Sequence, residues 1–156
     1  MIDGLTLRRA STAEQRDLEA LQRRASLMWE EDRPHLLANP GLIELPLEQI
    51  EGGRVFVADR RGVSVGFGVV LLRDDGEAEL DGLFVEPDCW RQGIGSRLMQ
   101  EAERLAHADG ATWLFVVANP RAVGFYSACG FAPLGEVKTL FGVGLAMRKA
   151  IEAPVA

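Results

Sequence analysis

The sequence predicts a mixed α/β fold in which most strands are antiparallel and a central pair is parallel. Three patterns predict it: apolar segments joined by glycine-containing turns over residues 53–85, a strand–helix–strand succession over residues 79–117, and helical spacing of apolar residues near the N-terminus. A chain of 156 residues suits one domain, residues 1–156. At this length about 70% of the surface is buried on folding. We therefore expect one mixed sheet packed against about four helices.

The N-terminal third is predicted to hold one strand and two helices. Residues Leu5–Arg8 alternate between apolar and polar side chains, which indicates a strand. Ser11 and Glu14 have the spacing of a capping box, and the helix that they open carries an apolar face made of Leu18, Leu21, Ala25 and Met28. A second helix is expected to begin near Pro46 and to end at Gly52–Gly53.

Antiparallel hairpins are predicted for the middle of the chain. The apolar segments Val55–Ala58, Val63–Leu72 and Glu79–Val85 are separated by the turns Arg60–Gly62 and Asp74–Gly76. Short turns that contain glycine, placed between such segments, are typical of hairpins.

A crossover connection follows the third of these strands. Its helix has an apolar stripe and ends at Gly110, and a strand over Thr112–Val117 comes next; the stripe consists of Leu98, Met99, Ala102, Leu105 and Ala106. Such a unit makes its two strands parallel. Ligands of sheets of this kind bind beyond the carboxyl ends of the strands, where Arg91–Ser96 and Asn119–Tyr126 both lie. A final hairpin carries Phe141, Val143, Leu145 and Met147 on one face.

The segment Gly93-Ile94-Gly95 at the start of the crossover helix has the composition of a phosphate cradle. The first N–H groups of a helix lack internal partners, and glycine removes the Cβ atoms that would keep an anion away. Arg91 and Arg97 add positive charge on either side. A tight turn without a ligand is the alternative. A Walker loop is absent, and Leu98 stands where a dinucleotide-binding fingerprint needs its third glycine.

Two separate motifs together resemble one family. Residues 85–95 read VxPxxxRxGxG and residues 119–131 read NxxAxxFYxxxGF. These motifs, in this order and at this separation, resemble the GCN5-related N-acetyltransferase superfamily over roughly residues 53–149. The sequence departs from the family pattern at Trp90, where an Arg or Gln is usual, although Arg91 and Gln92 follow directly.

The resemblance implies an acyl-CoA N-acyltransferase fold, acetyl-CoA as donor, and direct attack by a primary amine within a ternary complex. The acceptor is a small-molecule amine or a protein amine, and residues 29–50 would lie over its site. Relatives of this size often form homodimers. The implied donor-binding residues are Leu83, Phe84, Val85, Arg91, Gln92, Gly93, Ile94, Gly95, Ser96, Arg97, Asn119 and Phe125.

Three side chains are candidates for catalysis. Glu79 and Asp81 share one strand face, and a carboxylate there can take the proton of an alkylammonium ion, whose pKa is about 10.4. We slightly favour Glu79; solvent-facing strand acids are the alternative. The resemblance places Tyr126 beside the thioester sulfur. Full proton transfer from a phenol to a thiolate is uphill by about 2 kcal/mol unless the pKa of the phenol is lowered. The alternative for Tyr126 is a core aromatic.

Other classes of function are disfavoured. The net charge is −6 and no basic stripe is present, which argues against nucleic acid. No apolar run is long enough to span a membrane. Two cysteines are too few for a disulfide framework, so a cytosolic location is expected. No cluster suggests a metal, and Cys89 lacks an evident activating histidine. The alternatives left open are a non-catalytic acyl-CoA-binding sensor and, less favoured, a dinucleotide-dependent oxidoreductase.

Overall fold

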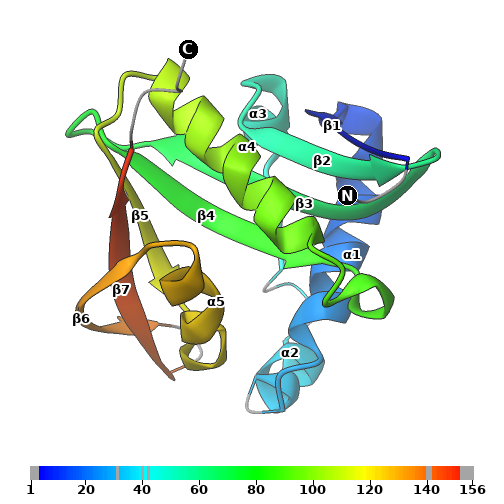
Figure 1. Cartoon of the computed structure of the whole chain (residues 1–156). Coiled ribbons are helices and arrows are strands. Elements are labelled where there is room, and N and C mark those ends of the chain that lie inside the picture. Colours follow the sequence, from blue (N-terminus) through cyan, green and yellow to red (C-terminus); the bar gives the residue numbers. More distant parts are fainter. Residues whose placement is uncertain (1–3, 31, 40, 42, 140–141, 152–156) are drawn as a thin grey trace. The chain divides into compact units, whose positions relative to one another are not determined.

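A computed structural model of the chain describes residues 4–30, 32–39, 41, 43–139 and 142–151 (Figure 1). The strands are β1 (Leu5–Arg9), β2 (Val55–Arg60), β3 (Val63–Leu72), β4 (Ala78–Val85), β5 (Trp113–Ala118), β6 (Ala132–Thr139) and β7 (Gly142–Ala150). The α-helices are α1 (Gln15–Ser26), α2 (Arg33–Ala38), α3 (Leu47–Glu51), α4 (Ile94–Ala108) and α5 (Val123–Ala128). Short 3-10 turns η1 (Thr12–Glu14), η3 (Pro87–Cys89) and η4 (Pro120–Ala122) precede α1, α4 and α5.

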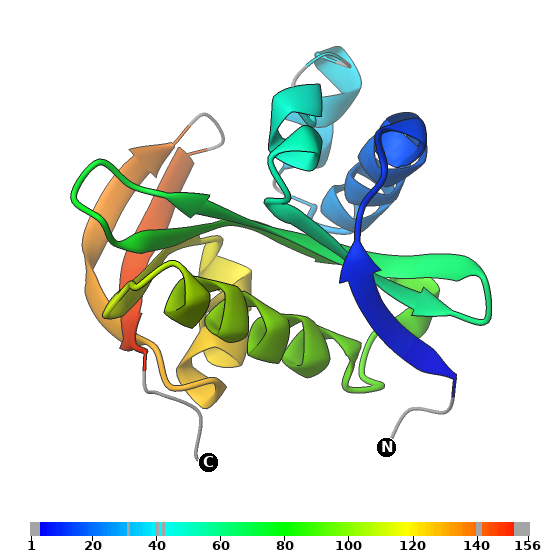
Figure 2. The ribbon, with the colours of Figure 1, turned by 90° about the horizontal axis from the view of Figure 1, so that it is seen from above.

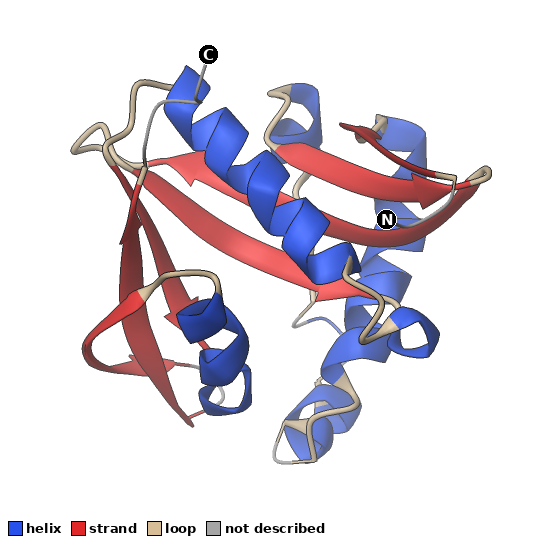
Figure 3. Ribbon diagram, in the orientation of Figure 1, coloured by secondary structure: helices blue, strands red, loops and turns tan. Residues whose placement is uncertain are grey.

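The strands form one mixed sheet in the order β1-β2-β3-β4-β5-β7-β6 (Figure 3). β4 and β5 are parallel, whereas β1–β2, β2–β3, β5–β7 and β6–β7 are antiparallel. The predicted mixed α/β fold with a central parallel pair is therefore confirmed. The chain clusters into two compact units that divide β3, β4 and α4 between them: residues 1–69 with 82–98, and residues 70–81 with 99–156. The assignment of residues 1–156 to a single domain stays a prediction.

The first unit contains β1, β2, the beginning of β3, the end of β4 and the start of α4, and α1 and α3 lie on one face of its strands (Figure 2). All four residues from Val55 to Ala58 are buried in β2, and α1 contributes the buried side chains of Leu18 and Leu21. The predicted apolar face of α1 is correct except at Met28, which lies beyond the end of the helix at Ser26 and is 48% exposed.

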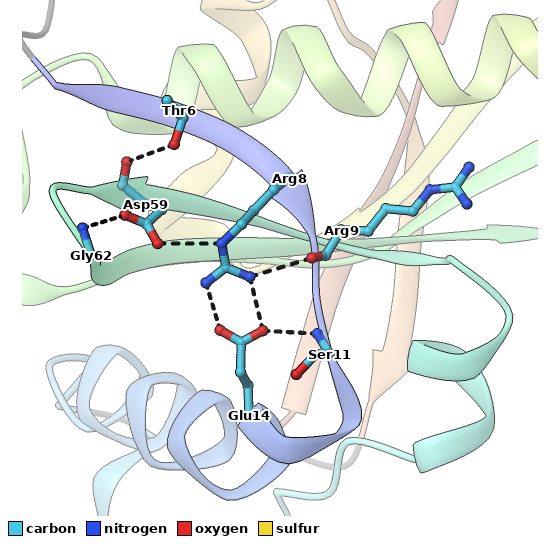
Figure 4. Close-up of polar contacts among 7 residues, drawn as sticks. All are labelled: Thr6, Arg8, Arg9, Ser11, Glu14, Asp59 and Gly62. Carbon is cyan, nitrogen blue, oxygen red and sulfur yellow. Dashed lines mark hydrogen bonds and ion pairs between the residues drawn. The ribbon is translucent and has the colours of Figure 1, made fainter.

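An ionic network joins β1 to the start of α1 (Figure 4). The Arg8 guanidinium donates to both carboxylate oxygens of Glu14, at 2.9 and 2.6 Å, and to Asp59 at 3.3 Å. Glu14 also accepts the backbone N–H of Ser11 at 2.8 Å, which is the predicted capping-box contact. These bonds to Arg8 hold the pKa of Glu14 below its ordinary value and raise that of Arg8. The network fixes where α1 begins, and α1 in turn leads into the segment before α2.

Helix α2 is additional to the helices that the sequence predicted. It spans only Arg33–Ala38 and buries Leu36, which is 1% exposed. A helix of this length presents a single buried residue, so no apolar period can indicate it.

The second unit contains the beginning of β4 and the strands β5, β7 and β6, which pair in that order. The parallel register runs from Ala78↔Leu114 to Leu80↔Val116. The apolar core of this unit includes Ala102 and Ala106 of α4 together with Leu114, Val116 and Met147. Phe141, which we expected in the last hairpin, lies outside the described residues. In the described part of the chain, no helix is both long and apolar enough to cross a membrane.

Candidate functional site

The loop between β4 and α4 presents a set of free backbone donors. The N–H of Arg97 donates to the carbonyl of Gly93 at 3.2 Å, so the amides of Ile94, Gly95 and Ser96 precede the first internal bond of the helix. Ile94 anchors the turn because it is 1% exposed, whereas Gly93 and Ser96 are exposed. This combination of fixed position and solvent-facing amides suits a phosphate group.

Two residues of this loop have left-handed backbone geometry. The φ angles are 64° at Arg91 and 85° at Gly93, and such alternation turns successive N–H groups toward one concave side. Among the described residues, neither Arg91 nor Arg97 makes an ion pair, so both guanidinium groups are available to an anion. The backbone geometry and the two guanidinium groups are compatible with a diphosphate, and the cradle stays a prediction.

Gly66 of β3 allows the first turn of α4 to lie against the sheet. A Cβ at this position would come within 2.9 Å of the Phe84 carbonyl oxygen and 3.0 Å of a Leu98 methyl group. Any larger side chain would push the helix start away from the strands. The sequence alone gave no signal for this role, because a strand glycine has several common explanations.

The end of β4 has an edge that a ligand can pair with. The N–H of Glu86 donates to the Val65 carbonyl on β3 at 2.8 Å. Successive residues of a strand point their backbone groups to opposite edges, so those of Leu83 and Val85 point away from β3. In the described part of the chain, the β4–β5 pairing covers only Ala78 to Leu80. Leu83 and Val85 therefore lie where an extended ligand can add as a strand.

Trp90, the departure from the family pattern, makes its contacts inside the first unit, with Val85 and Trp29. Its indole N–H donates to the Val85 carbonyl at 2.8 Å. Its ring stacks on Trp29, with centroids 5.6 Å apart and an interplanar angle of 29°. The side-chain donors that the usual Arg or Gln would bring are thus left to Arg91, Gln92 and Arg97.

In the second unit, Glu79 and Asp81 lie on the strand face that is shared with Phe115 of β5. Val117, two residues further along that face, is 43% exposed, and the Arg73 guanidinium lies 4.1 Å from the centre of the Phe115 ring. Asp81 is exposed, and partial desolvation of its carboxyl raises its pKa above the ordinary value. Asp81 is consequently a better proton acceptor than an ordinary surface aspartate.

Tyr126 is enclosed by aromatic rings. It is 8% exposed, and it meets Phe125 and Phe131 edge to face at centroid distances of 5.3 and 5.6 Å. Burial raises the pKa of Tyr126 to about 12. Proton transfer from this phenol to a thiolate of pKa about 8.5 is therefore uphill by about 5 kcal/mol. The lowered pKa that full proton transfer would require is therefore not found at Tyr126, because burial shifts this pKa in the other direction.

Asn119 fills the capping role that the sequence allowed. Its amide oxygen accepts the N–H of Arg121 at 3.0 Å and so fixes the start of η4. The turn continues into α5, which carries Phe125 and Tyr126.

The predicted site residues thus fall into one set in each unit. The first holds Leu83, Phe84, Val85, Arg91, Gln92, Gly93, Ile94, Gly95, Ser96 and Arg97; the second holds Glu79, Asp81, Asn119, Phe125 and Tyr126. The described residues include no group of histidine, cysteine and carboxylate side chains that could hold a metal ion.

Comparisons with known proteins agree on one family. Residues 16–131 match the model of the Acetyltransferase (GNAT) family. The curated peptidyl-lysine N-acetyltransferase YjaB of Salmonella typhimurium is 43% identical over 69 residues. That match covers 44% of this chain and 44% of YjaB, less than half of either protein.

Solved structures share the fold at low identity. PaiA N-acetyltransferase from Thermoplasma acidophilum, in complex with coenzyme A, superposes with a TM-score of 0.78 at 19% identity, over 94% of this chain and 98% of that one. The ribosomal-protein-S18-alanine N-acetyltransferase of Escherichia coli gives 0.70 at 18% identity, over 97% and 96%.

The raised pKa of Tyr126 can be measured directly, because the sequence contains one tyrosine. We expect tyrosinate absorbance of the folded protein to titrate with a midpoint at about pH 12, and that of the urea-unfolded chain at about pH 10. The folded state holds this proton more tightly than the unfolded state, so the fold should lose stability as the pH rises from about 10 to about 12. Circular dichroism recorded in parallel checks that sign. A midpoint near 10 in the folded protein would show that the phenol is solvated.

Proposed function

Because the chain belongs to the Acetyltransferase (GNAT) family, we propose that it transfers the acetyl group of acetyl-CoA to a primary amine. The observation that carries this proposal is the juxtaposition, within the first unit, of an exposed amide cradle and a pairing edge on β4. A diphosphate and an extended amide-containing arm are the two parts of coenzyme A that such features suit. A non-catalytic sensor would need the same features but has no use for Tyr126 and the acids of β4.

The donor would be held along its length. The amides of Gly93, Ile94, Gly95 and Ser96, with Arg91 and Arg97, would bind the diphosphate, and Gln92 lies between these donors. The backbone of Leu83 and Val85 would pair with the pantetheine arm. The Phe84 ring packs on the Phe67 ring, with centroids 5.2 Å apart, and keeps this end of the strand in place. Asn119 and Phe125 complete the proposed set.

The reaction would proceed by direct attack. An unprotonated amine attacks the thioester carbonyl carbon, a C–N bond forms, and the C–S bond breaks to release the coenzyme A thiolate. An alkylammonium ion has a pKa of about 10.4, so its proton must be removed first. We propose that Asp81 receives this proton through water, because desolvation raises the pKa of its carboxyl. Glu79 lies two residues earlier on the same strand face. The thiolate is then protonated from solvent.

Tyr126 would stabilise the departing sulfur by donating a hydrogen bond without giving up its proton, since burial raises its pKa to about 12. Most of the acceleration would come from holding the amine and the thioester in reacting geometry.

A protein amine, with lysine first, is the acceptor that we favour. The partial match to a peptidyl-lysine N-acetyltransferase supports it. The exposed Val117 beside the acids of β4 also supports it, because an open apolar surface accommodates the aliphatic stem of a lysine better than it fits a highly polar small amine.

Self-association and a cytosolic location are also part of this proposal. The residues Ala132 to Lys138 of β6 are all exposed, and both cysteines are free thiols. Two copies of β6 paired antiparallel about Val137 would place Glu136 of each copy opposite Lys138 of the other, so the strand is complementary to itself in charge. Pro133 and the bulge that follows limit this pairing to the second half of β6.

The proposed activity is tested by thiol release from acetyl-CoA in the presence of lysine peptides, peptides with free N-termini and small amines. Lysine peptides are expected to stimulate release most strongly. Stimulation by small amines alone would support the acetyltransferase activity but contradict the proposed lysine acceptor. Tight binding of coenzyme A with no stimulation by any amine would leave the sensor as the function.

The proton acceptor is tested with the matched pair Asp81→Asn and Glu79→Gln. We expect Asp81→Asn to lower kcat/KM about a hundredfold at neutral pH and Glu79→Gln to change it by less than about threefold. The deficit of Asp81→Asn should shrink as the pH rises toward about 10, where the amine loses its proton unaided. The opposite ranking of the two variants would assign the role to Glu79.

Pairing through β6 is tested by a charge-reversal cycle read by light scattering on a sizing column. Wild type is expected to be dimeric, and Lys138→Glu monomeric, because acids then face each other across the pair. Glu136→Lys combined with Lys138→Glu restores opposite charges and should restore the dimer. Identical mass for all three proteins would remove β6 as the interface.

A further inference from the structure

The indole of Trp90 occupies a specific backbone acceptor. Its N–H donates to the carbonyl of Val85, the last residue of β4, at 2.8 Å. Val85 directs its backbone groups away from β3, because the next residue, Glu86, donates its N–H to Val65 on that strand. The Val85 carbonyl thus lies on the edge that an extended ligand can join, and a side chain of the same chain already holds it.

The bond from the Trp90 indole reduces the number of backbone groups on the β4 edge that are left for a ligand. The groups left for a ligand are the N–H and carbonyl of Leu83 and the N–H of Val85. A ligand that pairs as a strand can shift along an edge in steps of two residues, which is roughly 6.6 Å. A shift toward α4 by one such step would need the Val85 carbonyl as an acceptor. With the indole already donating to it, the Val85 carbonyl has one lone pair left, so pairing one step further would gain less than pairing at Leu83.

A ring stack holds the indole, and an ion pair holds the end of the strand beside it. Its ring stacks on Trp29 at 5.6 Å, and Trp29 lies between α1 and α2. One residue beyond Val85, the Glu86 carboxylate accepts two bonds from the Arg24 guanidinium of α1, at 2.6 and 2.8 Å. The connection from β4 to the cradle is therefore held by an aromatic contact and a bidentate ion pair, both within the first unit.

We propose that Trp90 is a positioning residue that ends the pairing edge of β4 and thereby sets the register in which the pantetheine arm of acetyl-CoA docks. This inference rests on the proposed function, because it assumes that an acyl-CoA arm uses this edge. It gives the departure from the usual Arg or Gln a physical role. The phosphates are served by Arg91 and Arg97, while Trp90 determines how far along the strand the thioester is placed.

The test compares Trp90→Phe with Trp113→Phe. Phenylalanine keeps an aromatic ring against Trp29 but has no N–H to donate. Trp113 lies on β5, where the Arg148 guanidinium covers its ring at 3.8 Å, and it serves as a matched control outside the loop. We expect Trp90→Phe to lower kcat for acetyl transfer about tenfold while the KM for acetyl-CoA stays within about twofold, because binding in a shifted register is unproductive. Trp113→Phe should leave both constants unchanged.

Hydrogen exchange followed by NMR supplies a readout besides activity. In wild type, coenzyme A should protect the Leu83 and Val85 amides, and the Trp90 indole proton should exchange slowly with and without ligand. In Trp90→Phe, bound coenzyme A should protect these amides less completely, because two registers are then populated. A fast-exchanging Trp90 indole in wild type would overturn the proposal without recourse to any variant.

The remaining outcomes distinguish failure of the positioning role from failure of the proposed acetyltransferase function. If Trp90→Phe matches wild type in kcat and amide protection, the positioning role is wrong while the acetyltransferase stands. If kcat, coenzyme A affinity and melting temperature all fall together, Trp90 serves stability alone, and the positioning role is likewise wrong. If wild type neither binds coenzyme A nor releases thiol, the proposed function itself fails.

Discussion

The site depends on the close approach of the first turn of α4 to β3, which Gly66 permits. A Cβ at this position would come within 2.9 Å of the Phe84 carbonyl oxygen and 3.0 Å of a Leu98 methyl group, so glycine leaves the room that both occupy. That contact holds Ile94 in the core and leaves the neighbouring amides at the surface. A helix start supplies anion-binding donors only if it is held still, because each donor must be aligned with the ligand. The proposed diphosphate contacts therefore follow from a packing constraint on the opposite side of the helix.

The proposed mechanism relies on placement of the reactants more than on acid catalysis. The pKa of Tyr126 is raised to about 12, so the residue is poorly suited to give up a proton but remains a hydrogen-bond donor at every physiological pH. The pKa of Asp81 is raised too, which makes that carboxylate a stronger base. Desolvation raises the pKa at both positions. At Tyr126 the raised pKa keeps the phenol neutral, and at Asp81 it increases the proton affinity of the carboxylate.

Much of the fold could be predicted, because its signals are periodic. The bounds of β3 match the predicted strand, the capping box of Ser11 and Glu14 is present, and the predicted family is confirmed by the match over residues 16–131. Helix α2 could not be predicted, because it buries one leucine. The direction of the Tyr126 pKa shift also could not be predicted, because it depends on rings brought together by α5 and the strand after it. The roles of Trp90 and Gly66 rest on contacts between distant segments, which no local motif encodes.

The stack of Trp29 on Trp90 has a consequence for how the acceptor range of such an enzyme can diverge. In the family that this sequence resembles, the segment containing Trp29 lies over the acceptor. Here the same segment supplies Trp29, whose ring stacks on Trp90 in the loop that we propose binds the donor. Substitutions that adapt the chain to a new amine would be tolerated more readily at the exposed residues that follow, such as Leu37, which is 60% exposed, than at Trp29. If Trp90 positions the acetyl-CoA arm as proposed, a change at Trp29 would disturb donor binding whatever the amine, and new selectivity should be easiest to evolve around a retained tryptophan.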